Sequence, residues 1–314
     1  MSGFSLDMAT ISPAGEILAR FKDATKARPK LIQSSAQSDS MEKTLEYIQE
    51  QLSLVADMEI IGTHELFYHI DGTMRAKAWK LFLGCPTDVS KELYTSICQD
   101  EPKLFDTKIK DDAFRTFKGN ADFWGKVTED SIVRVLNALS FDFGYVQGMN
   151  VLLGPFLYVM SEVDSYFCMK AMLSHHIPRY VLKNLDGAHD GAKLFSKCLR
   201  IVDPKLFTHI SSKIPDLSIF SLRYVLTLFA NAQPLSEVLK LWDCIFAIGP
   251  QFNILLLCSK LMSMRDSLLK EKRGAKIMSL LDDAPVVSSS LIDGAFSLMR
   301  FIPAPLYLEM ISHA

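Results

Sequence analysis

Three short fragments hold the residue types best suited to chemistry or to binding a partner. They are Arg75 and Trp79 in the spacing R-x-x-x-W, Asp112 followed by Arg115-Thr116, and Tyr145-Val-Gln-Gly-Met-Asn150. Arginine carries a permanent charge on a rigid fork of donors, and a glutamine amide both donates and accepts hydrogen bonds. In the third fragment, Gln147, Gly148 and Asn150 interrupt an otherwise apolar stretch that continues to residue 160.

Each fragment taken alone also has an ordinary structural explanation. Arg75 could pair with any surface carboxylate while Trp79 packs in the core. Asp112 and Arg115 are three residues apart and could form an ordinary helix ion pair. Gln147 could be a satisfied buried amide near the start of a helix. One at a time, the fragments favour structure over function.

Other kinds of site are poorly supported by the sequence. Gly187-Ala-His-Asp-Gly-Ala-Lys193 resembles a phosphate loop only superficially, because Ala192 separates the second glycine from the lysine. We interpret it as a turn that begins a helix. His175 and His176 are adjacent and would point about 100° apart on a helix, which does not suit a shared metal. We therefore expect no metal site and no bound nucleotide in this chain.

Composition limits the class of protein. The 314 residues are 49% hydrophobic, which provides a sizeable core, and the net charge of −2 does not point to nucleic acid or an anionic membrane. The six cysteines form no C-x-x-C pair, which fits a reducing compartment. No apolar run approaches the roughly 20 residues of a membrane span. We expect a soluble protein of the cytosol or nucleus, without a membrane span.

The fold expected from the apolar periodicity is all-α, an irregular array of many helices. Apolar residues recur at helical spacing behind Thr128 and between Pro234 and Gly249, and no alternating run demands a strand. Residues 1–40 are predicted to be a mobile arm with one short helix at 17–21. Residues 41–314 lack a linker that would separate lobes. Further helices are predicted at 41–55, 74–83, 164–176, 191–200, 217–231, 252–271 and 291–311.

The three fragments, in this order, together resemble the TBC domain of GTPase-activating proteins for Rab-type small GTPases. The motifs are R-x-x-x-W, I-x-x-D-x-x-R-T and Y-x-Q-G-M, and the late segment Leu239-Lys-Leu-Trp-Asp243 is similar to the family's R-I-W-D. The resemblance assigns residues 41–314 to the TBC domain region, with a motif-bearing core at 60–265 and a C-terminal helical segment at 266–314. It implies a TBC fold of two tightly packed helical lobes. Phe117 departs from the family pattern, in which proline commonly follows the arginine-threonine pair.

The resemblance also implies site residues and a mechanism. Arg115 would enter the GTPase in trans to stabilise the transition state, and Gln147 would replace the GTPase's own glutamine in positioning water. Asp112 could orient Arg115, and Gly148 would allow close approach of the GTPase backbone. Candidates for supporting the site or binding the GTPase are Arg75, Asp112, Thr116, Tyr145, Gly148 and Asn150. No cofactor is implied for this chain, since GTP and Mg²⁺ would belong to the GTPase.

One branch of the family is especially similar, the fungal checkpoint subunits that restrain mitotic exit or septation. The similarity lies in Asn184–Lys193 and Leu199–Leu206. It implies a Ras-like GTPase as partner, a second, non-catalytic subunit, and a cytoplasmic location at the spindle pole body. Such a protein activates an enzyme and has no substrate of its own. The alternative is a non-catalytic TBC module that only binds a GTPase or scaffolds a complex, although a scaffold would not need both Arg115 and Gln147.

Overall fold

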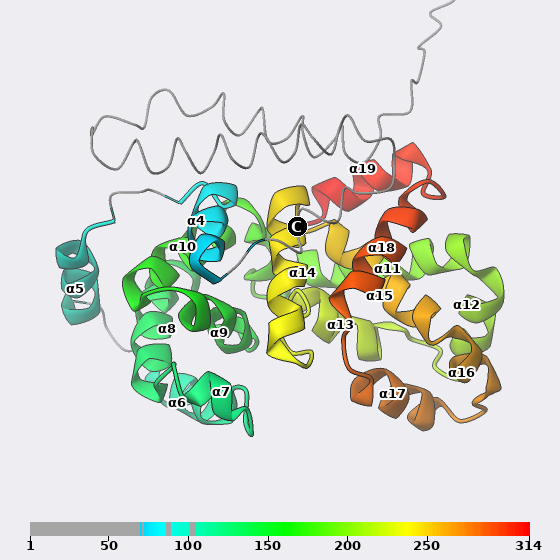
Figure 1. The fold of residues 1–314 in the computed structure, drawn as a ribbon, viewed down its shortest axis with the longest axis horizontal. Coiled ribbons are helices and arrows are strands. Elements are labelled where there is room, and N and C mark those ends of the chain that lie inside the picture. The colour runs from blue at the N-terminus through cyan, green and yellow to red at the C-terminus, as the bar shows by residue number, and fades with distance from the viewer. Residues whose placement is uncertain (1–69, 71, 86–88, 101–104) are drawn as a thin grey trace, which may run out of the picture. The chain divides into compact units, whose positions relative to one another are not determined.

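The computed structural model describes residue 70 and residues 72–85, 89–100 and 105–314. Every regular element in these ranges is a helix, which confirms the all-α prediction (Figure 1). The arm predicted at 1–40 and the helices predicted at 17–21 and 41–55 lie outside the described residues. In chain order the helices are α4 (Gly72–Phe82), α5 (Lys91–Asp100), α6 (Asp106–Arg115), α7 (Ala121–Trp124), α8 (Glu129–Phe143), α9 (Met149–Val159), α10 (Glu162–His175), the 3₁₀ helix η1 (Pro178–Tyr180), α11 (Asp186–Val202), α12 (Pro204–Ser211), α13 (Ser218–Leu226), α14 (Leu235–Ile248), α15 (Phe252–Ser263), α16 (Arg265–Lys270), α17 (Gly274–Asp283), α18 (Ser288–Met299) and α19 (Ala304–Ser312).

Residues 70–314 form one compact unit built from two groups of helices. Helices α6, α8, α9 and α10 pack on one another, while α11, α13, α15 and α18 form the second group. Helix α14 contacts α4, which packs on α9 of the first group, and α18 from the second, and it lies between the two groups in Figure 1. This arrangement agrees with the expectation of two tightly packed helical lobes.

Aromatic side chains fill the junction between α4, α9 and α14. Trp79 lies 5.5 Å from Trp242 and 5.7 Å from Phe156, measured between ring centroids, and Phe246 closes the cluster at 5.2 Å from Trp79. Trp79, Trp242 and Phe156 are fully buried. Burying such large rings contributes much of the free energy that holds α4 against α14.

Helix α8 begins, and helix α14 begins and ends, at the residues that the sequence indicates. The Thr128 side chain accepts a hydrogen bond from the Ser131 backbone N–H and caps α8. Helix α14 begins directly after Pro234 and ends at Gly249, whose φ of 124° only glycine adopts easily. The predictions for these two helices are confirmed.

Three long predicted helices are shorter or broken in the structure. The helix predicted at 217–231 ends at Leu226, because Leu228 and Phe229 have φ of 49° and 65°, outside the helical region. The one at 252–271 is two helices, α15 and α16, that meet at Met264. The one at 291–311 is interrupted before α19, where Pro303 precedes the helix. Apolar periodicity continues across each break, so it could not reveal the turn.

The last helix, α19, is fastened by the residue that follows it. Nδ1 of His313 lies 2.6 Å from the Met310 carbonyl oxygen and must donate to it, so Nε2 accepts from the Tyr180 hydroxyl at 2.8 Å. Arg179 donates to the His313 carbonyl at 2.8 Å. His313 and Tyr180 are both buried. A proton added to Nε2 would therefore remove the acceptor of a buried hydroxyl.

We expect this C-terminal attachment to weaken in acid. The pKa of His313 is lowered, chiefly by burial. The hydrogen bond to the Met310 carbonyl raises it, Arg179 lowers it further, and Asp190 raises it by the smallest amount. A lowered histidine pKa contributes stability that is complete above the ordinary value of about 6.5 and is lost as pH falls through the folded-state value. Lowering the pH from about 7.5 to about 5.5 should therefore destabilise the wild type more than a His313→Gln variant, as measured by thermal unfolding at each pH. Equal pH dependence in the two proteins would contradict this role.

Within the described part of the chain, the helices are all too short or too polar to cross a lipid bilayer.

Candidate functional site

Arg115 is the last residue of α6 and points its side chain into solvent. The side chain is 55% exposed, and Nη2 donates to Oδ1 of Asp112 at 2.5 Å. Asp112 is buried, so the pair has one fixed member and one exposed member. An ion pair with an exposed arginine is weak in water. The guanidinium can therefore leave Asp112 at little cost in free energy.

Gln147 lies in the loop between α8 and α9, and its side chain is exposed. The next residue, Gly148, has φ of 109° and is buried directly before α9. A Cβ built on Gly148 would lie 3.3 Å from Cδ2 of Leu226 and 3.9 Å from Cγ2 of Thr227. Glycine is thus required at position 148 both by the positive φ and by the close approach of Leu226, at the end of α13. The Leu226 side chain therefore lies close to where a side chain at position 148 would begin, so this space is not open to a partner.

Buried hydrogen bonds tie the arginine segment to the glutamine loop. The Tyr145 hydroxyl donates to Oδ2 of Asp112 at 2.7 Å, so the two oxygens of this carboxylate bind Arg115 and Tyr145 respectively. Asn150 Nδ2 donates to Oγ1 of Thr116 at 2.8 Å, and its Oδ1 accepts from the Gly148 N–H at 3.1 Å. One network therefore joins the residues on either side of Arg115 to those on either side of Gln147.

The network is shielded from water. Asp112, Thr116, Tyr145 and Asn150 are between 1% and 6% exposed. Burial, followed by the hydrogen bond to Asp112, raises the pKa of the Tyr145 hydroxyl, which keeps its proton and remains a donor. Hydrogen bonds in a low-dielectric interior are stronger and more rigid than those at the surface. The structure thus places these four predicted supporting residues together, beneath two exposed side chains.

Phe117 holds the segment that follows Arg115. Its φ of 47° is uncommon for a large side chain, and its ring is mostly buried and lies 4.6 Å from the ring of Phe123. The ring also lies against the backbone of α9, where a Cβ on Gly154 would meet Cε2 of Phe117 at 2.1 Å. Only a residue without a side chain fits at position 154. The bulky Phe117 is thus accompanied by a matching glycine on the facing helix.

Gly154→Ala should destabilise the protein by about 1–3 kcal/mol, since the added methyl group overlaps the Phe117 ring and the surroundings must shift. Chemical denaturation measures this loss. Gly72→Ala is a matched control, because nothing lies within 4 Å of a Cβ at that helical position. If Gly154→Ala cost no more than Gly72→Ala, Phe117 would not be packed as described.

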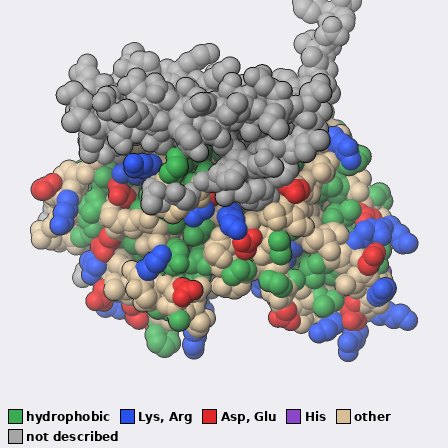
Figure 2. Space-filling model, viewed as in Figure 1, with side chains coloured by type: hydrophobic (Ala, Val, Ile, Leu, Met, Phe, Trp, Pro, Cys, Tyr) green, Lys and Arg blue, Asp and Glu red, His purple; other side chains and the backbone are tan. Residues whose placement is uncertain are grey.

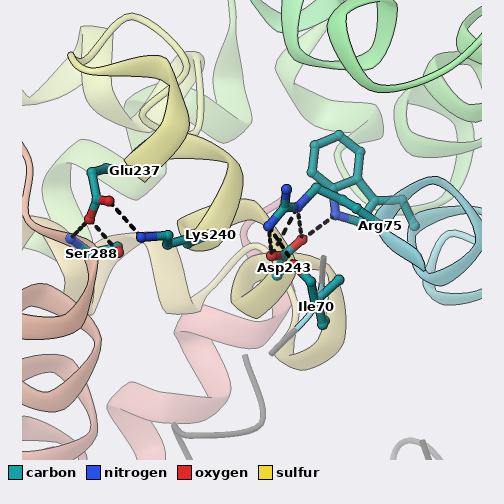
Figure 3. Close-up of polar contacts among 7 residues, drawn as sticks. Ile70, Arg75, Glu237, Lys240, Asp243 and Ser288 are labelled. Carbon is teal, nitrogen blue, oxygen red and sulfur yellow. Dashed lines mark hydrogen bonds and ion pairs between the residues drawn. The ribbon is translucent and has the colours of Figure 1, made fainter. Parts of the chain in front are cut away.

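Arg75 is not part of this network. Its guanidinium donates from Nε and Nη2 to the carboxylate of Asp243 at 2.9–3.1 Å and from Nη2 to the Ile70 carbonyl at 2.8 Å (Figure 3). Trp79 Nε1 donates to Oδ1 of Asp243 at 2.7 Å. The first motif therefore binds the last one, W-D, and joins α4 to α14.

Asp243 is the residue of this junction whose role the sequence did not reveal. It is fully buried, and burial raises the pKa of its carboxyl to about 6 even though Arg75 and Trp79 favour the ionised form. At neutral pH the carboxylate is charged and fully hydrogen-bonded.

Figure 3 also shows a second set of polar contacts on α14, in which Glu237 accepts hydrogen bonds from Lys240 and from Ser288 of α18. Both interactions are structural and hold α14 in place.

The fragment that superficially resembled a phosphate loop is helical. Gly187 and Gly191 lie in the first turns of α11, where a Cβ would meet Cδ1 of Tyr180 at 2.7 Å and Cγ1 of Val225 at 2.6 Å respectively. These glycines allow close packing of helices. His175 is the last residue of α10, and no group of histidine, cysteine and carboxylate side chains in the described residues could hold a metal ion.

Comparisons with known proteins agree with the motifs. Cell division control protein 16 of Schizosaccharomyces pombe is 34% identical over 247 residues, which cover 78% of this chain and 82% of that protein. Mitotic check point protein BUB2 of Saccharomyces cerevisiae is 32% identical over 257 residues, covering 76% and 83% of the two chains. The solved flagellar RabGAP TBC domain of Chlamydomonas covers 83% of this chain and 93% of its own, with a TM-score of 0.66 and 17% identity, and so shares the fold. Residues 72–269 match the Rab-GTPase-TBC domain. The chain therefore belongs to the family of TBC-domain Rab GTPase-activating proteins.

Proposed function

We propose that this protein stimulates GTP hydrolysis by a Rab- or Ras-like small GTPase and that Arg115 and Gln147 act in trans on the bound nucleotide. Membership of the TBC family implies a small GTPase as partner. The observation that carries the proposal is the buried network of Asp112, Thr116, Tyr145 and Asn150. It fixes the two segments on which Arg115 and Gln147 are exposed, and a site that must hold two groups at one phosphate needs such support.

The two side chains suit the two requirements of the reaction. Negative charge develops around the transferred phosphoryl group, and an arginine supplied by the activating protein stabilises it. Asp112 keeps Arg115 oriented before the GTPase arrives, and the exposed Arg115 side chain can leave this contact readily. The attacking water must be aligned, and the Gln147 amide can accept from it while donating to a neighbouring oxygen. GTP and Mg²⁺ belong to the GTPase.

The cellular setting is part of the proposal. The similar proteins from the two yeasts are named for cell division control and for a mitotic check point. These names support a role in a checkpoint that controls mitotic exit or septation. We further propose that the protein works with a second, non-catalytic subunit and acts in the cytoplasm at the spindle pole body.

Single-turnover GTP hydrolysis tests the activity directly. A panel of purified Rab- and Ras-like GTPases is loaded with GTP and mixed with this protein, alone and with a candidate second subunit. We expect stimulation of at least one GTPase by about 10³-fold or more. If a GTPase binds tightly and its hydrolysis stays at the intrinsic rate in both mixtures, the protein is a non-catalytic TBC module and the proposal is wrong.

A further inference from the structure

Phe114, the residue before Arg115, exposes an aromatic ring beside the candidate site. Its side chain is 66% exposed, the largest value among the large hydrophobic residues in the described part of the chain. A phenylalanine in water forgoes about 1.5–3 kcal/mol that burial would provide. Helix α6 has no structural need for it, since Ile109 and Ala113 already face the core and are fully buried.

A cation accompanies this ring. Lys118 Nζ lies 5.7 Å from the centroid of the Phe114 ring, and the Lys118 side chain is exposed. The surface beside Arg115 therefore offers an apolar ring edged by positive charge. Its complement on a partner is an apolar recess bordered by carboxylates.

The position of Phe114 in the chain indicates which partner covers it. Adjacent Cα atoms are only about 3.8 Å apart, so a protein that receives Arg115 must come close to Phe114. A standard interface buries about 800 Å² on each partner, equivalent to a disc of about 16 Å radius. Such an interface centred near Arg115 covers both Phe114 and Lys118.

We propose that Phe114 is an anchor that binds the GTPase, in an apolar recess with an acidic border, and that Lys118 contributes to selecting GTPases with that border. The inference rests on the proposed function and extends it from the chemistry of hydrolysis to the choice of partner. Anchors at protein interfaces are typically aromatic residues or arginines, and they account for most of the binding free energy.

Binding and hydrolysis measured separately test this role. The probe is the GTPase that responds most strongly in the panel, loaded with a non-hydrolysable GTP analogue for titration calorimetry and with GTP for kinetics. Phe114→Ala should raise Kd and KM by about 30-fold or more. The rate at saturating concentrations should remain within about twofold of wild type, since no reacting atom is touched. Phe114→Leu should recover most of the affinity.

The controls separate docking from folding. Phe301→Ala removes a ring that is 50% exposed, in the turn after α18, and should change neither Kd nor KM. Lys118→Glu should weaken binding more at low salt than at high salt. Thermal unfolding of all variants should match wild type, because Phe114 and Lys118 are exposed.

Each outcome decides one of the two proposals or both. Wild-type Kd for Phe114→Ala overturns the anchor, whether or not hydrolysis is stimulated. Weaker binding by Phe114→Ala to a GTPase that is bound but never stimulated supports the anchor and rejects the catalytic role. Loss of self-association in place of GTPase binding would assign Phe114 to a contact between copies and overturn the inference. If the wild type binds no GTPase in the panel, both proposals fail.

Discussion

Replacing Arg115 by alanine should lower the maximal rate of stimulated GTP hydrolysis by about 10³-fold or more while binding of the GTPase changes far less. The guanidinium is needed when charge develops on the phosphoryl group, so its loss should reduce kcat rather than raise KM. Folding should change little, because the Arg115 side chain is 55% exposed and the Tyr145 hydroxyl still donates to the buried Asp112 carboxylate. Single-turnover kinetics at saturating concentrations measure the effect.

Two further substitutions refine this test. Arg115→Lys keeps one positive charge but loses the planar fork of donors, so it should recover little of the rate. Arg300→Ala removes another exposed arginine, at the end of α18, and should leave kcat unchanged. If Arg115→Ala hydrolysed GTP at the wild-type rate, the positive charge at the nucleotide would have to come from elsewhere.

Gln147→Ala belongs to the same test because the two side chains are proposed to act together. It should also abolish most of the stimulation, and the double variant should be little worse than either single variant. Two independent, additive losses would contradict joint action at one phosphate.

The catalytic candidates could be proposed from the sequence, whereas the structure that supports them could not. Arg115 and Gln147 lie in short motifs that are recognisable locally. The hydrogen bonds that join their segments connect Tyr145 to Asp112 and Asn150 to Thr116, across 33 and 34 residues. A lone asparagine or tyrosine gives no sign of its partner, and only the packing of α6 against α8 and α9 brings them together.

The packing of the glycines and of Phe117 could not be predicted from the sequence for the same reason, because the contacts join residues far apart in the chain. A glycine in a sequence indicates freedom of the backbone or close packing, but the neighbour that requires it lies elsewhere in the chain. Gly154 faces Phe117 and Gly148 faces Leu226, across 37 and 78 residues. Arg75 and Asp243 are 168 residues apart. The sequence therefore does not indicate that Asp243 is the partner of Arg75.

Asp243→Ala should cost about 3–5 kcal/mol of folding stability at neutral pH, the largest loss we expect from any single ion pair in the described residues. Arg75 is only 12% exposed, so the substitution leaves a nearly buried cation without its carboxylate. It also removes the acceptor of the fully buried Trp79 indole N–H. Chemical denaturation measures the loss. Asp142→Ala, which breaks the half-exposed pair with Lys170, should cost only about 0.2–1 kcal/mol.

The size of this loss comes from the charge left behind, not from the net strength of the pair. Burial already opposes the ionised form of Asp243, as its pKa of about 6 indicates. Exchanging both members for apolar residues, Arg75→Met with Asp243→Leu, should therefore restore much of the stability that Asp243→Ala loses. The indole N–H of Trp79 would still lack its acceptor, so recovery should be incomplete. A double variant no more stable than Asp243→Ala would mean that the pair itself holds α4 against α14. Recovery would show that the junction depends chiefly on its aromatic core, and that Arg75 could be lost without touching the network beneath Arg115 and Gln147.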